Sequence, residues 1–280
     1  MKMTNNKVVE FENVYFEYSE NKPILKNVSF EIYENEYVCI LGHNGSGKST
    51  ISKVLVGLLK PRKGQVKLFG TPVSAQNLKD LRNNIGIVFQ NPDNQFVGLL
   101  VKDDIAFGLE NRKVPPKIIN EIIDITAKSI GIEHLLDKSP EDLSGGQKQK
   151  VAIASVLAFN PQITIFDEST SMLDPKSKRE LKELMFDLKQ KAKKTIISIT
   201  HDMEEVLQAD RVIVLEKGEI VLNGSPNEIF LSNQDIAKYK LDFPFIYQLS
   251  HSLNQNNKDI SLTLNKDNLL NQLCNIKKIK

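Results

Sequence analysis

Residues 42 to 49 have the types and the spacing of a loop that holds phosphate groups. They read Gly-His-Asn-Gly-Ser-Gly-Lys-Ser, a full match to the pattern G-x-x-x-x-G-K-[ST]. Glycines let such a loop curl and point its N–H groups inward, at the positive end of the following helix. Lys48 would then reach the β- and γ-phosphates of a nucleotide, and the Ser49 hydroxyl would bind Mg²⁺.

The segments on both sides of this loop have the patterns that it requires. Residues 37–41 are apolar and rich in β-branched side chains, as a buried strand should be, and residues 50–56 have helical spacing. Strand, loop and helix in this order favour a phosphate site over a glycine-rich turn that merely opens a helix.

Two carboxylates end a second apolar strand, which reads Ile-Thr-Ile-Phe-Asp-Glu over residues 163–168. An enzyme with a phosphate loop needs an acid at the end of a neighbouring strand to hold Mg²⁺, and Asp167 meets that need. Glu168 is then placed to orient or deprotonate the attacking water. A strand that is capped by solvated acids is the alternative, and the phosphate loop argues against it.

A second anion site is predicted at residues 143–147, Leu-Ser-Gly-Gly-Gln. Ser144 is a natural N-cap, and the two glycines leave N–H groups exposed at a positive helix end. One phosphate chain does not need two such sites unless they come from different subunits. The alternative is an ordinary capped helix start, and the residues alone leave both interpretations open.

Three further side chains stand where strands end. His201 follows a predicted strand, and a neutral imidazole there could hydrogen-bond to a γ-phosphate. Gln90 ends another strand, where its amide could contact Mg²⁺ or the attacking water. Tyr18 could stack on a purine ring. Each also has a structural interpretation: a strand-end histidine, a loop glutamine and an exposed tyrosine.

The composition sets limits on the class of protein. The chain has 280 residues, of which 40% are hydrophobic and 26% charged, which is ordinary for a globular protein. A net charge of +2 gives no strong field for nucleic acid. No apolar run reaches the roughly 18–20 residues that span a bilayer, and residues 1–7 lack the apolar core of a signal peptide. Cys39 and Cys274 have no metal or redox spacing, which predicts a reducing cytoplasm and no disulfide.

The elements that must carry these residues alternate between strands and helices, which predicts an α/β fold with parallel βαβ units. Residues 19–23 are expected to form a turn, and the Pro and Gly of residues 60–64 to end the first helix. The remaining predicted strands cover residues 8–16, 28–32, 65–69, 85–89 and 195–199, and residues 211–222 form a hairpin with Gly218 in its turn. The remaining predicted helices cover residues 117–130, 147–159 and 176–191, and residues 91–160 are mainly helical.

The order of these motifs resembles the nucleotide-binding domain of the ABC ATPases. The resemblance covers residues 8–230 and also includes Ser171-Met-Leu-Asp174, which is similar to the family's D-loop. It implies nucleotide contacts from Tyr18, Gly42, His43, Asn44, Gly45, Ser46, Gly47, Lys48, Ser49, Thr50, Ser144, Gly145, Gly146, Gln147 and Asp174. It implies catalytic roles for Glu168, His201 and Gln90, and Mg²⁺ ligation by Ser49, Gln90 and Asp167.

The resemblance also implies an architecture. It is an antiparallel β subdomain, a mainly parallel core sheet and a helical subdomain, within a P-loop ABC-type nucleotide-binding domain over residues 5–230. Residues 231–280 are expected to be a partly helical C-terminal extension, with no structure assigned to residues 277–280. The family works as a head-to-tail dimer that holds two ATP molecules between one subunit's phosphate loop and the other's Ser144–Gln147 motif, which accounts for two anion sites in one chain.

Two segments give a finer resemblance, to the ATPase subunits of energy-coupling factor (ECF) transporters. They are Phe-Gln-Asn-Pro-Asp-Asn-Gln-Phe-Val-Gly at residues 89–98 and Asp-Asp-Ile-Ala-Phe-Gly-Leu-Glu-Asn at residues 103–111. Residues 168–175, Glu-Ser-Thr-Ser-Met-Leu-Asp-Pro, are similar to the first of that family's two paired ATPases. Ser169 stands where alanine is usual and Lys150 where arginine is usual, and neither position touches phosphate. Gln95 is expected to help meet the transmembrane partner.

The resemblance implies an ATPase, peripheral at the cytoplasmic face of the cell membrane, whose ATP hydrolysis with Mg²⁺ drives uptake of vitamins or other micronutrients. The implied partners are a second, similar ATPase, a transmembrane scaffold and a membrane substrate-binding subunit, without nucleic acid. That last subunit selects the substrate, so no residue of this chain should encode it.

Other classes fit the sequence less well. The ATPase of an ordinary ABC importer is the nearest alternative, and residues 91–95 argue against it. A soluble ABC ATPase that acts on nucleic acid or ribosomes usually has two ATPase domains or a long coiled coil, whereas this chain has one phosphate loop and no sustained heptads. A non-hydrolysing structural subunit would not need Asp167, Glu168 and His201.

Overall fold

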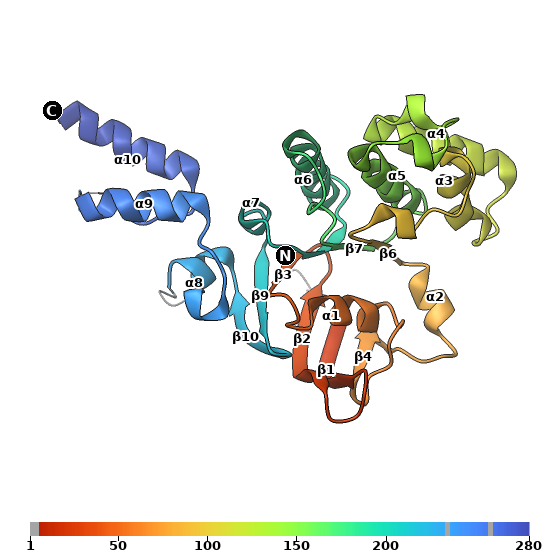
Figure 1. Ribbon diagram of the computed structural model, residues 1–280, viewed down its shortest axis with the longest axis horizontal. Coiled ribbons are helices and arrows are strands. Elements are labelled where there is room, and N and C mark those ends of the chain that lie inside the picture. Colours follow the sequence, from red (N-terminus) through yellow and green to blue (C-terminus); the bar gives the residue numbers. More distant parts are fainter. Residues whose placement is uncertain (1–5, 233–235, 257–259, 280) are drawn as a thin grey trace.

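The computed structural model describes residues 6–232, 236–256 and 260–279. Two sheets form its centre (Figure 1). The first is antiparallel, with the strand order β2-β1-β4-β5. Its strands are β1 (Lys7–Glu17), β2 (Pro23–Tyr33), β4 (Lys63–Leu68) and β5 (Thr71–Pro72). This sheet is the expected antiparallel subdomain.

The second sheet has six strands in the order β10-β9-β3-β8-β7-β6. All of its neighbouring pairs are parallel except β9 and β10, which form the predicted hairpin. The strands are β3 (Tyr37–Leu41), β6 (Ile85–Val88), β7 (Ile163–Asp167), β8 (Thr195–Ile199), β9 (Arg211–Glu216) and β10 (Glu219–Gly224). Every residue of β3, β7 and β8 is buried, because both faces of this sheet are covered.

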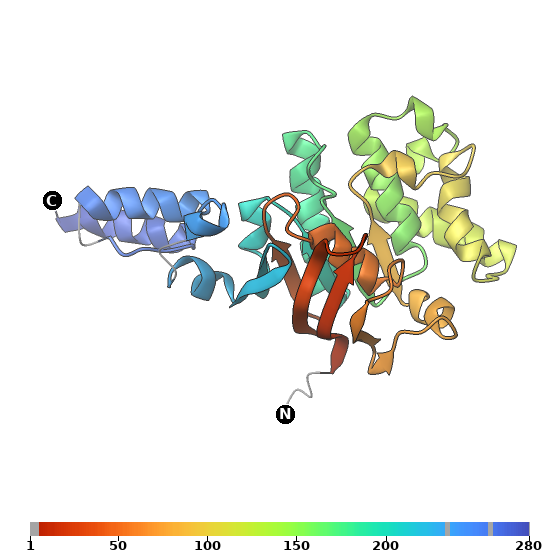
Figure 2. The same ribbon diagram turned by 60° about the horizontal axis from the view of Figure 1, so that its bottom comes forward.

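Helices cover the sheets and form a separate group beside them (Figures 1 and 2). The α-helices are α1 (Lys48–Leu55), α2 (Leu78–Arg82), α3 (Val101–Glu110), α4 (Pro116–Ile130), α5 (Gly145–Leu157), α6 (Pro175–Gln190), α7 (Met203–Val206), α8 (Pro226–Phe230), α9 (Phe245–Asn256) and α10 (Lys266–Ile279). Helices α3, α4 and α5 pack around a hydrophobic cluster of their own that includes Val101, Ile105, Ile123 and Val151. They form the helical subdomain expected within residues 91–160.

Two other clusters sit on opposite faces of the six-stranded sheet. One lies between this sheet and the antiparallel sheet and buries Ile51 and Leu55 of α1. The other lies on the far face and buries Leu181 and Met185 of α6 together with Phe230 of α8. The six-stranded sheet is therefore the rigid layer from which the loops at its edges project.

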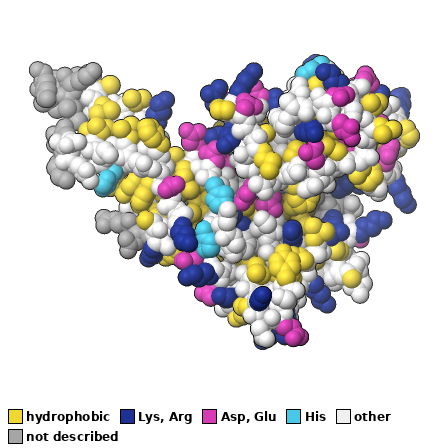
Figure 3. Space-filling model, in the orientation of Figure 1, with side chains coloured by type: hydrophobic (Ala, Val, Ile, Leu, Met, Phe, Trp, Pro, Cys, Tyr) yellow, Lys and Arg dark blue, Asp and Glu magenta, His cyan; other side chains and the backbone are white. Residues whose placement is uncertain are grey.

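The C-terminal part of the chain carries α9 and α10, which lie side by side at the end of the molecule opposite the helical subdomain (Figures 1 and 2). A ring series joins them to the core: Phe243 contacts Phe230 of α8 at 6.5 Å and stacks on Tyr247 of α9 at 4.3 Å between ring centroids. Figure 3 shows hydrophobic side chains gathered over these two helices, and Phe245 and Leu270 are among the exposed ones.

Most predicted elements are confirmed, with errors at their ends. The strand predicted at residues 28–32 begins at Pro23, so Pro23 lies in β2 rather than in the turn. The first helix was predicted to end at residues 60–64, which is wrong. Helix α1 ends at Leu55, Gly57 follows with a φ of +67°, and Gly64 lies within β4. Helices α1 and α5 each begin two residues before their predicted starts: α1 begins at Lys48 after the N-cap Gly47, and α5 begins at Gly145 after the N-cap Ser144.

Two expectations concern the membrane and the cysteines. None of the helices in the described parts of the chain is both long and apolar enough to cross a membrane. Cys39 is buried in β3 and Cys274 is exposed, and both are free thiols. The expectation about a signal peptide concerns residues 1–7, of which 1–5 lie outside the described residues.

One buried polar group of β7 lacks a partner, and this gives a stability prediction. The Thr164 hydroxyl is fully buried and has no hydrogen-bond partner among the described residues. Thr164→Val replaces that hydroxyl by a methyl group of the same shape, so we expect the free energy of unfolding to rise by about 1 kcal/mol. Urea unfolding of the purified chain measures it.

Thr195 of β8 provides the matched control. Its hydroxyl is also buried, but it accepts a hydrogen bond of 2.9 Å from the Asn35 N–H. Thr195→Val should therefore lower the free energy of unfolding by about 1 kcal/mol. Equal effects of the two substitutions would show that the buried hydroxyl of Thr164 has no cost.

Candidate functional site

The candidate site lies at the edge of the six-stranded sheet where the parallel strands end. The register pairs Ile40 of β3 and Asp167 of β7 with the same residue of β8, Ile199, so the three strands end at one level. The phosphate loop follows β3, Glu168 follows β7 and His201 follows β8 within two residues. The fold therefore brings together side chains from three distant parts of the chain, as the sequence predicted.

The phosphate loop has the backbone that its glycines permit. Gly42 and Gly47 have φ values of +153° and +110°, and a Cβ atom would lie 2.4 Å from the Leu215 carbonyl oxygen or 2.9 Å from a Leu25 methyl group, respectively. Lys48 turns back over the loop, and its Nζ donates to the Gly42 carbonyl oxygen at 2.7 Å. Burial lowers the pKa of Lys48, and the nearby carboxylates of Glu168 and Asp167 oppose that shift.

Asp167 is buried at the end of β7 and faces α1. Its Oδ2 accepts a hydrogen bond of 2.8 Å from the Ser52 hydroxyl, one turn along the helix from the phosphate loop. Burial raises the pKa of Asp167, and the hydrogen bond from Ser52 lowers it. Ser52 is a site residue that motif reasoning missed, and its position one helical turn after Lys48 was the available signal.

Glu168 has a left-handed backbone with a φ of +52°, which is unusual for a side chain of this kind. Hydrogen bonds hold it there: its N–H donates to the Ile199 carbonyl oxygen at 2.8 Å, and its own carbonyl accepts from the Ser171 hydroxyl at 2.8 Å. Strain of this kind persists where the surroundings fix it, often at sites of chemistry.

The Glu168 carboxylate lies between two cationic or polar groups. Its Oε1 is 3.7 Å from Lys48 Nζ and 3.3 Å from His201 Nε2. Burial and the charge of Lys48 lower the pKa of His201, whereas Glu168 raises it, with a net shift downward. His201 is therefore neutral near neutral pH, and it can donate or accept a hydrogen bond without adding a charge to the site.

An open cavity of about 460 Å³ lies at the phosphate loop, and Asp167 and His201 are not among the residues that line it. Lys48 and Ser49 of the phosphate loop line it together with Glu168 and Gln90, whose Nε2 also donates to the Ser171 hydroxyl at 3.2 Å. Tyr18 stands at the same cavity with an exposed ring, and its hydroxyl is 3.4 Å from that of Thr50. The lining of the cavity therefore suits a ligand that has a phosphate chain and a flat ring, with that ring beside Tyr18.

The oxygen ligands at this cavity fit Mg²⁺. A hydroxyl, an amide oxygen and a carboxylate are hard oxygen ligands, and Ser49, Gln90 and Asp167 supply one of each at or beside the cavity. Burial of Asp167 is a second indication, because a bound cation would compensate the cost of the buried carboxylate.

The second predicted anion site is not part of this cavity. Ser144 begins α5 with a capping box, in which its hydroxyl accepts from the Gln147 N–H and the Gln147 side chain accepts from the Ser144 N–H. A Cβ on Gly145 would meet nothing within 4 Å, so the start of the helix is open. Gly146 lies instead against Ser177 at the start of α6. Within one chain, the two anion sites are separate.

Asp174 lies beside this helix start as the N-cap of α6. Its Oδ1 accepts from the N–H groups of Lys176 and Ser177, and its Oδ2 from the Ser177 hydroxyl. These hydrogen bonds, first that of the hydroxyl, lower the pKa of Asp174. The structure thus gives Asp174 a structural task, and its contact with a nucleotide stays a prediction.

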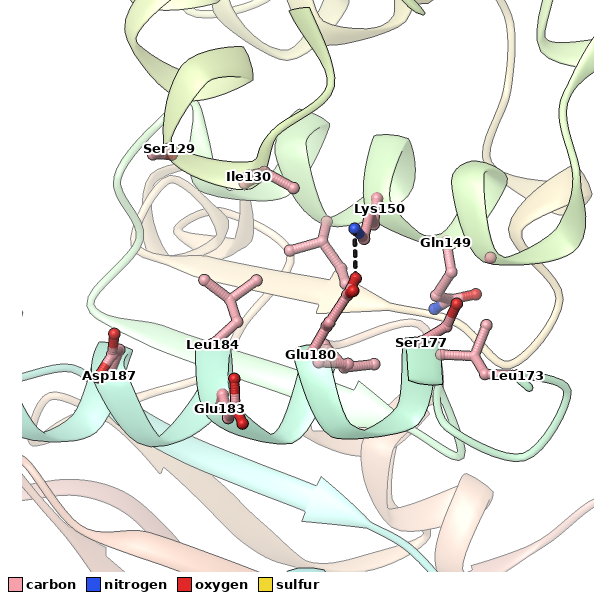
Figure 4. A pocket seen from close by; sticks show the side chains of 13 residues that line it. Ser129, Ile130, Gln149, Lys150, Leu173, Ser177, Glu180, Glu183, Leu184 and Asp187 are labelled. Atoms are coloured by element: carbon pink, nitrogen blue, oxygen red, sulfur yellow. Dashed lines mark ion pairs between the residues drawn. The ribbon is translucent and has the colours of Figure 1, made fainter. Parts of the chain in front are cut away.

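A cleft of about 330 Å³ separates the helical subdomain from α6 (Figure 4). Lys150 of α5 bridges it by an ion pair of 2.6 Å with Glu180 of α6. Lys150, which stands where the resembling family has arginine, therefore joins the two subdomains. Ser169 is buried and does not line the cavity at the phosphate loop.

The Gln95 side chain is hydrogen-bonded within the loop that follows β6. Its Oε1 accepts from the Phe89 N–H at 2.9 Å and its Nε2 donates to the Ile87 carbonyl oxygen at 3.4 Å, so its amide closes the loop after β6. These hydrogen bonds hold the Gln95 amide within its own loop, and a contact of Gln95 with a transmembrane partner stays a prediction. Val97 and Leu99 of the same loop are 64% and 85% exposed and form its outer surface.

Comparisons with known proteins agree with this geometry. The family described as ABC transporter matches residues 25–171. The energy-coupling factor transporter ATP-binding protein EcfA1 of Ureaplasma parvum is 64% identical over 95% of this chain and 90% of its own length. The energy-coupling factor transporter ATP-binding protein EcfA of Malacoplasma penetrans is 60% identical over 96% of this chain and 93% of its own length.

Solved structures of ABC proteins are also similar to this chain. CbiO1 of Clostridium perfringens, part of the ABC transporter complex CbiONQ, matches with a TM-score of 0.76 and 37% identity over 89% of this chain and 99% of its own. The ATP-binding cassette MJ0796, a dimer in a post-hydrolysis state bound to ADP and Pi, matches with a TM-score of 0.71 and 31% identity over 78% of this chain and 98% of its own.

The electrostatics around His201 give a test of the site. We expect the NMR titration midpoint of the His201 imidazole to lie below its ordinary 6.5. Lys48→Met should raise the pKa of His201, because it removes a positive charge, and Glu168→Gln should lower it further.

The lowered pKa of His201 also affects stability. In the unfolded chain this histidine binds a proton more readily than it does in the folded chain, so its protonation makes the fold less stable as pH falls below about 6.5.

His201→Gln identifies the resonance, because only that signal disappears. A midpoint at or above 6.5, or one that neither charge substitution moves, would contradict the arrangement of Lys48, Glu168 and His201 described above.

Proposed function

The chain belongs to the ABC transporter family and, within it, to the ATP-binding proteins of energy-coupling factor transporters; from this we propose how its site and surfaces work. It is an ATPase subunit of such a transporter. We propose that its ATP hydrolysis drives the uptake of vitamins or other micronutrients, and that it sits peripherally at the cytoplasmic face of the cell membrane. Its nucleotide-binding domain covers residues 5–230, and residues 231–280 form a C-terminal extension.

The observation that carries the assignment of the site is the convergence on Glu168. One carboxylate oxygen lies 3.7 Å from the phosphate-loop lysine and 3.3 Å from His201, at a cavity that the phosphate loop itself lines. A base for the attacking water and a cation at the phosphate oxygens are groups that phosphoryl transfer uses, and the neutral imidazole adds a hydrogen-bonding group beside the base.

Each residue then has a role that follows from its position. The N–H groups of the phosphate loop and Lys48 bind the phosphate oxygens, and Tyr18 stacks on the base. Glu168 orients the attacking water and accepts its proton, while His201 hydrogen-bonds to the γ-phosphate. Ser49, Gln90 and Asp167 would hold Mg²⁺, which would supply positive charge to the phosphate groups. Catalysis is then mainly positioning and charge stabilisation.

The separate second anion site supports a dimer. Gly145 and Gly146 at the start of α5 are exposed or face α6, away from the cavity of the same chain. We propose that this helix start binds the γ-phosphate held by a second, similar ATPase subunit, with Asp174 near the same nucleotide. The related cassette MJ0796 is dimeric in its complex with ADP and Pi.

The loop after Gln90 is the proposed contact with a transmembrane scaffold. Its inner side is fixed by Gln95, and its outer side presents Val97 and Leu99. The loop also follows directly from the cavity, so a change at Gln90 would move the apolar surface. A separate membrane subunit binds the transported substrate, in the manner of the family.

The role of Glu168 can be tested by Glu168→Gln. This substitution keeps the size and polarity of the side chain but removes the base, so ATP should still bind while turnover falls at least about 100-fold. A fluorescent ATP titration measures binding, and phosphate release measures turnover. Lys48→Ala is the control, because it should lower the affinity for ATP, which Glu168→Gln should retain. Near-normal phosphate release by Glu168→Gln would overturn the role of Glu168.

The partners can be tested by purifying the tagged chain from membranes with a mild detergent and identifying the bound proteins by mass. We expect a second, similar ATPase, a transmembrane scaffold and a small substrate-binding membrane protein. A single type of ATPase with two ordinary permease subunits would leave the ATPase chemistry intact and contradict the proposed assembly.

A further inference from the structure

Glu205 is a buried carboxyl group for which the proposed reaction has no use. It lies in α7 with 1% of its surface exposed, on the face of the sheet that the α6 cluster covers. It does not line the nucleotide cavity. Burial of a carboxyl group among apolar side chains is costly unless hydrogen bonds compensate it, so its presence calls for a reason.

Three hydroxyl groups from two strands and the following loop converge on this carboxyl. Oε1 accepts from the hydroxyls of Tyr37 on β3 and Ser198 on β8, the former at 3.2 Å. Oε2 accepts from the hydroxyl of Thr200, just after β8, at 3.0 Å. Burial raises the pKa of Glu205, and the hydrogen bonds from Ser198 and Thr200 lower it.

Thr200 is the residue before His201, and its hydroxyl closes the turn that carries this histidine. The Thr200 oxygen accepts a hydrogen bond of 3.0 Å from the Asp202 N–H, two residues along the chain. The single proton of that hydroxyl points to Glu205 Oε2, so a lone pair is left for Asp202. Glu205 therefore fixes the orientation of the hydroxyl that closes the turn, and each of the two hydrogen bonds strengthens the other.

The other side of the same turn is also held. The Asp202 carboxylate caps α7 by accepting from the N–H groups of Glu204 and Glu205, and it pairs with the buried Lys182 of α6 at 3.2 Å. With both of its neighbours fixed, His201 reaches Glu168 across the sheet edge at 3.3 Å.

We propose that Glu205 is a positioning residue for ATP hydrolysis: through the Thr200 hydroxyl it holds the turn that presents His201 to Glu168 and the γ-phosphate. The proposal rests on the proposed ATPase function and deepens it. Glu205 and Thr200 do not line the cavity at the phosphate loop, so we expect the effect to fall mainly on kcat.

Thr200→Val gives the sharpest test, because it keeps the shape of the side chain and removes only the hydroxyl. We expect it to lower kcat roughly 10- to 100-fold in the complex purified from membranes with its partner subunits, since small displacements of a catalytic group have effects of this size. The KM for ATP should stay within about threefold of the unchanged value, because uniform substrate binding is untouched. Thr200→Ser, which keeps the hydroxyl, should restore kcat.

Thr164→Val is the matched control. It is the same chemical change at a buried threonine of the neighbouring strand β7, but that hydroxyl has no partner among the described residues. Its kcat and KM should equal those of the unchanged chain. If Thr200→Val lowers only the melting temperature and leaves kcat like that of Thr164→Val, the Thr200 hydroxyl is merely structural and the proposal is wrong.

Glu205 itself is tested by two substitutions. Glu205→Gln retains an acceptor for Thr200, so its kcat should stay within about threefold, whereas Glu205→Ala should lose as much kcat as Thr200→Val. In the double variant of Glu205→Ala with Thr200→Val, kcat should fall no further than in Thr200→Val, because the two residues act in series. If the losses of kcat in the two single variants multiply in the double variant, Glu205 does not act through Thr200. If Glu205→Ala does not fold, the Thr200→Val and Thr200→Ser pair decides.

Two controls separate this proposal from the function on which it rests. If the complex that contains the unchanged chain and its partner subunits does not hydrolyse ATP, or if Glu168→Gln retains turnover, the proposed function fails. If the unchanged chain is active and Glu168→Gln is inactive, while Thr200→Val is normal, only the role of Glu205 is refuted.

Discussion

The site depends on the parallel pairing of β3, β7 and β8. This pairing ends three strands at one level, with Ile40 and Asp167 both opposite Ile199. Lys48, Glu168 and His201 then meet within 4 Å, although more than a hundred residues separate the first from the second. Because side chains alternate between the faces of a strand, a register shift of one residue would turn Asp167 away from Ser52 and the phosphate loop. The hydrogen bonds of the sheet therefore set the geometry of the chemistry.

The burial of β3, β7 and β8 explains why this part of the fold could be predicted from the sequence. Strands that are covered on both faces are rich in apolar and β-branched side chains, and so are residues 37–41, 163–166 and 195–199. The polar residues that follow such strands are conspicuous by contrast, so Asp167, Glu168 and His201 could be found. Element ends were predicted less well, because ends depend on single backbone conformations. Gly57 rather than the proline at position 61 ends the first helix region, through a left-handed φ of +67°.

Side-chain directions were the part that the sequence could not provide. Gln95 lies in a segment that resembles a partner-binding loop, yet its amide bonds to the backbone at Phe89 and Ile87. Ser52 and Ser171 belong to the site, but each acts through a hydrogen bond whose partner is set by tertiary packing. A motif gives residue types and spacing along the chain. It does not state which of several nearby donors an acceptor takes, because that choice depends on what else the fold brings close.

Lys48 connects these observations to catalysis. Its ammonium is buried, donates to the carbonyl oxygens of Gly42 and His43, and lies 3.7 Å from Glu168, so its partners are two neutral oxygens and one more distant carboxylate. A phosphate group at the loop would be a stronger partner for Lys48 than Glu168 is, since it brings more negative charge to closer range. Glu168 would then be left with neutral His201 as its neighbour and with a carboxylate free to accept a proton from water. Nucleotide binding would thus itself prepare the base.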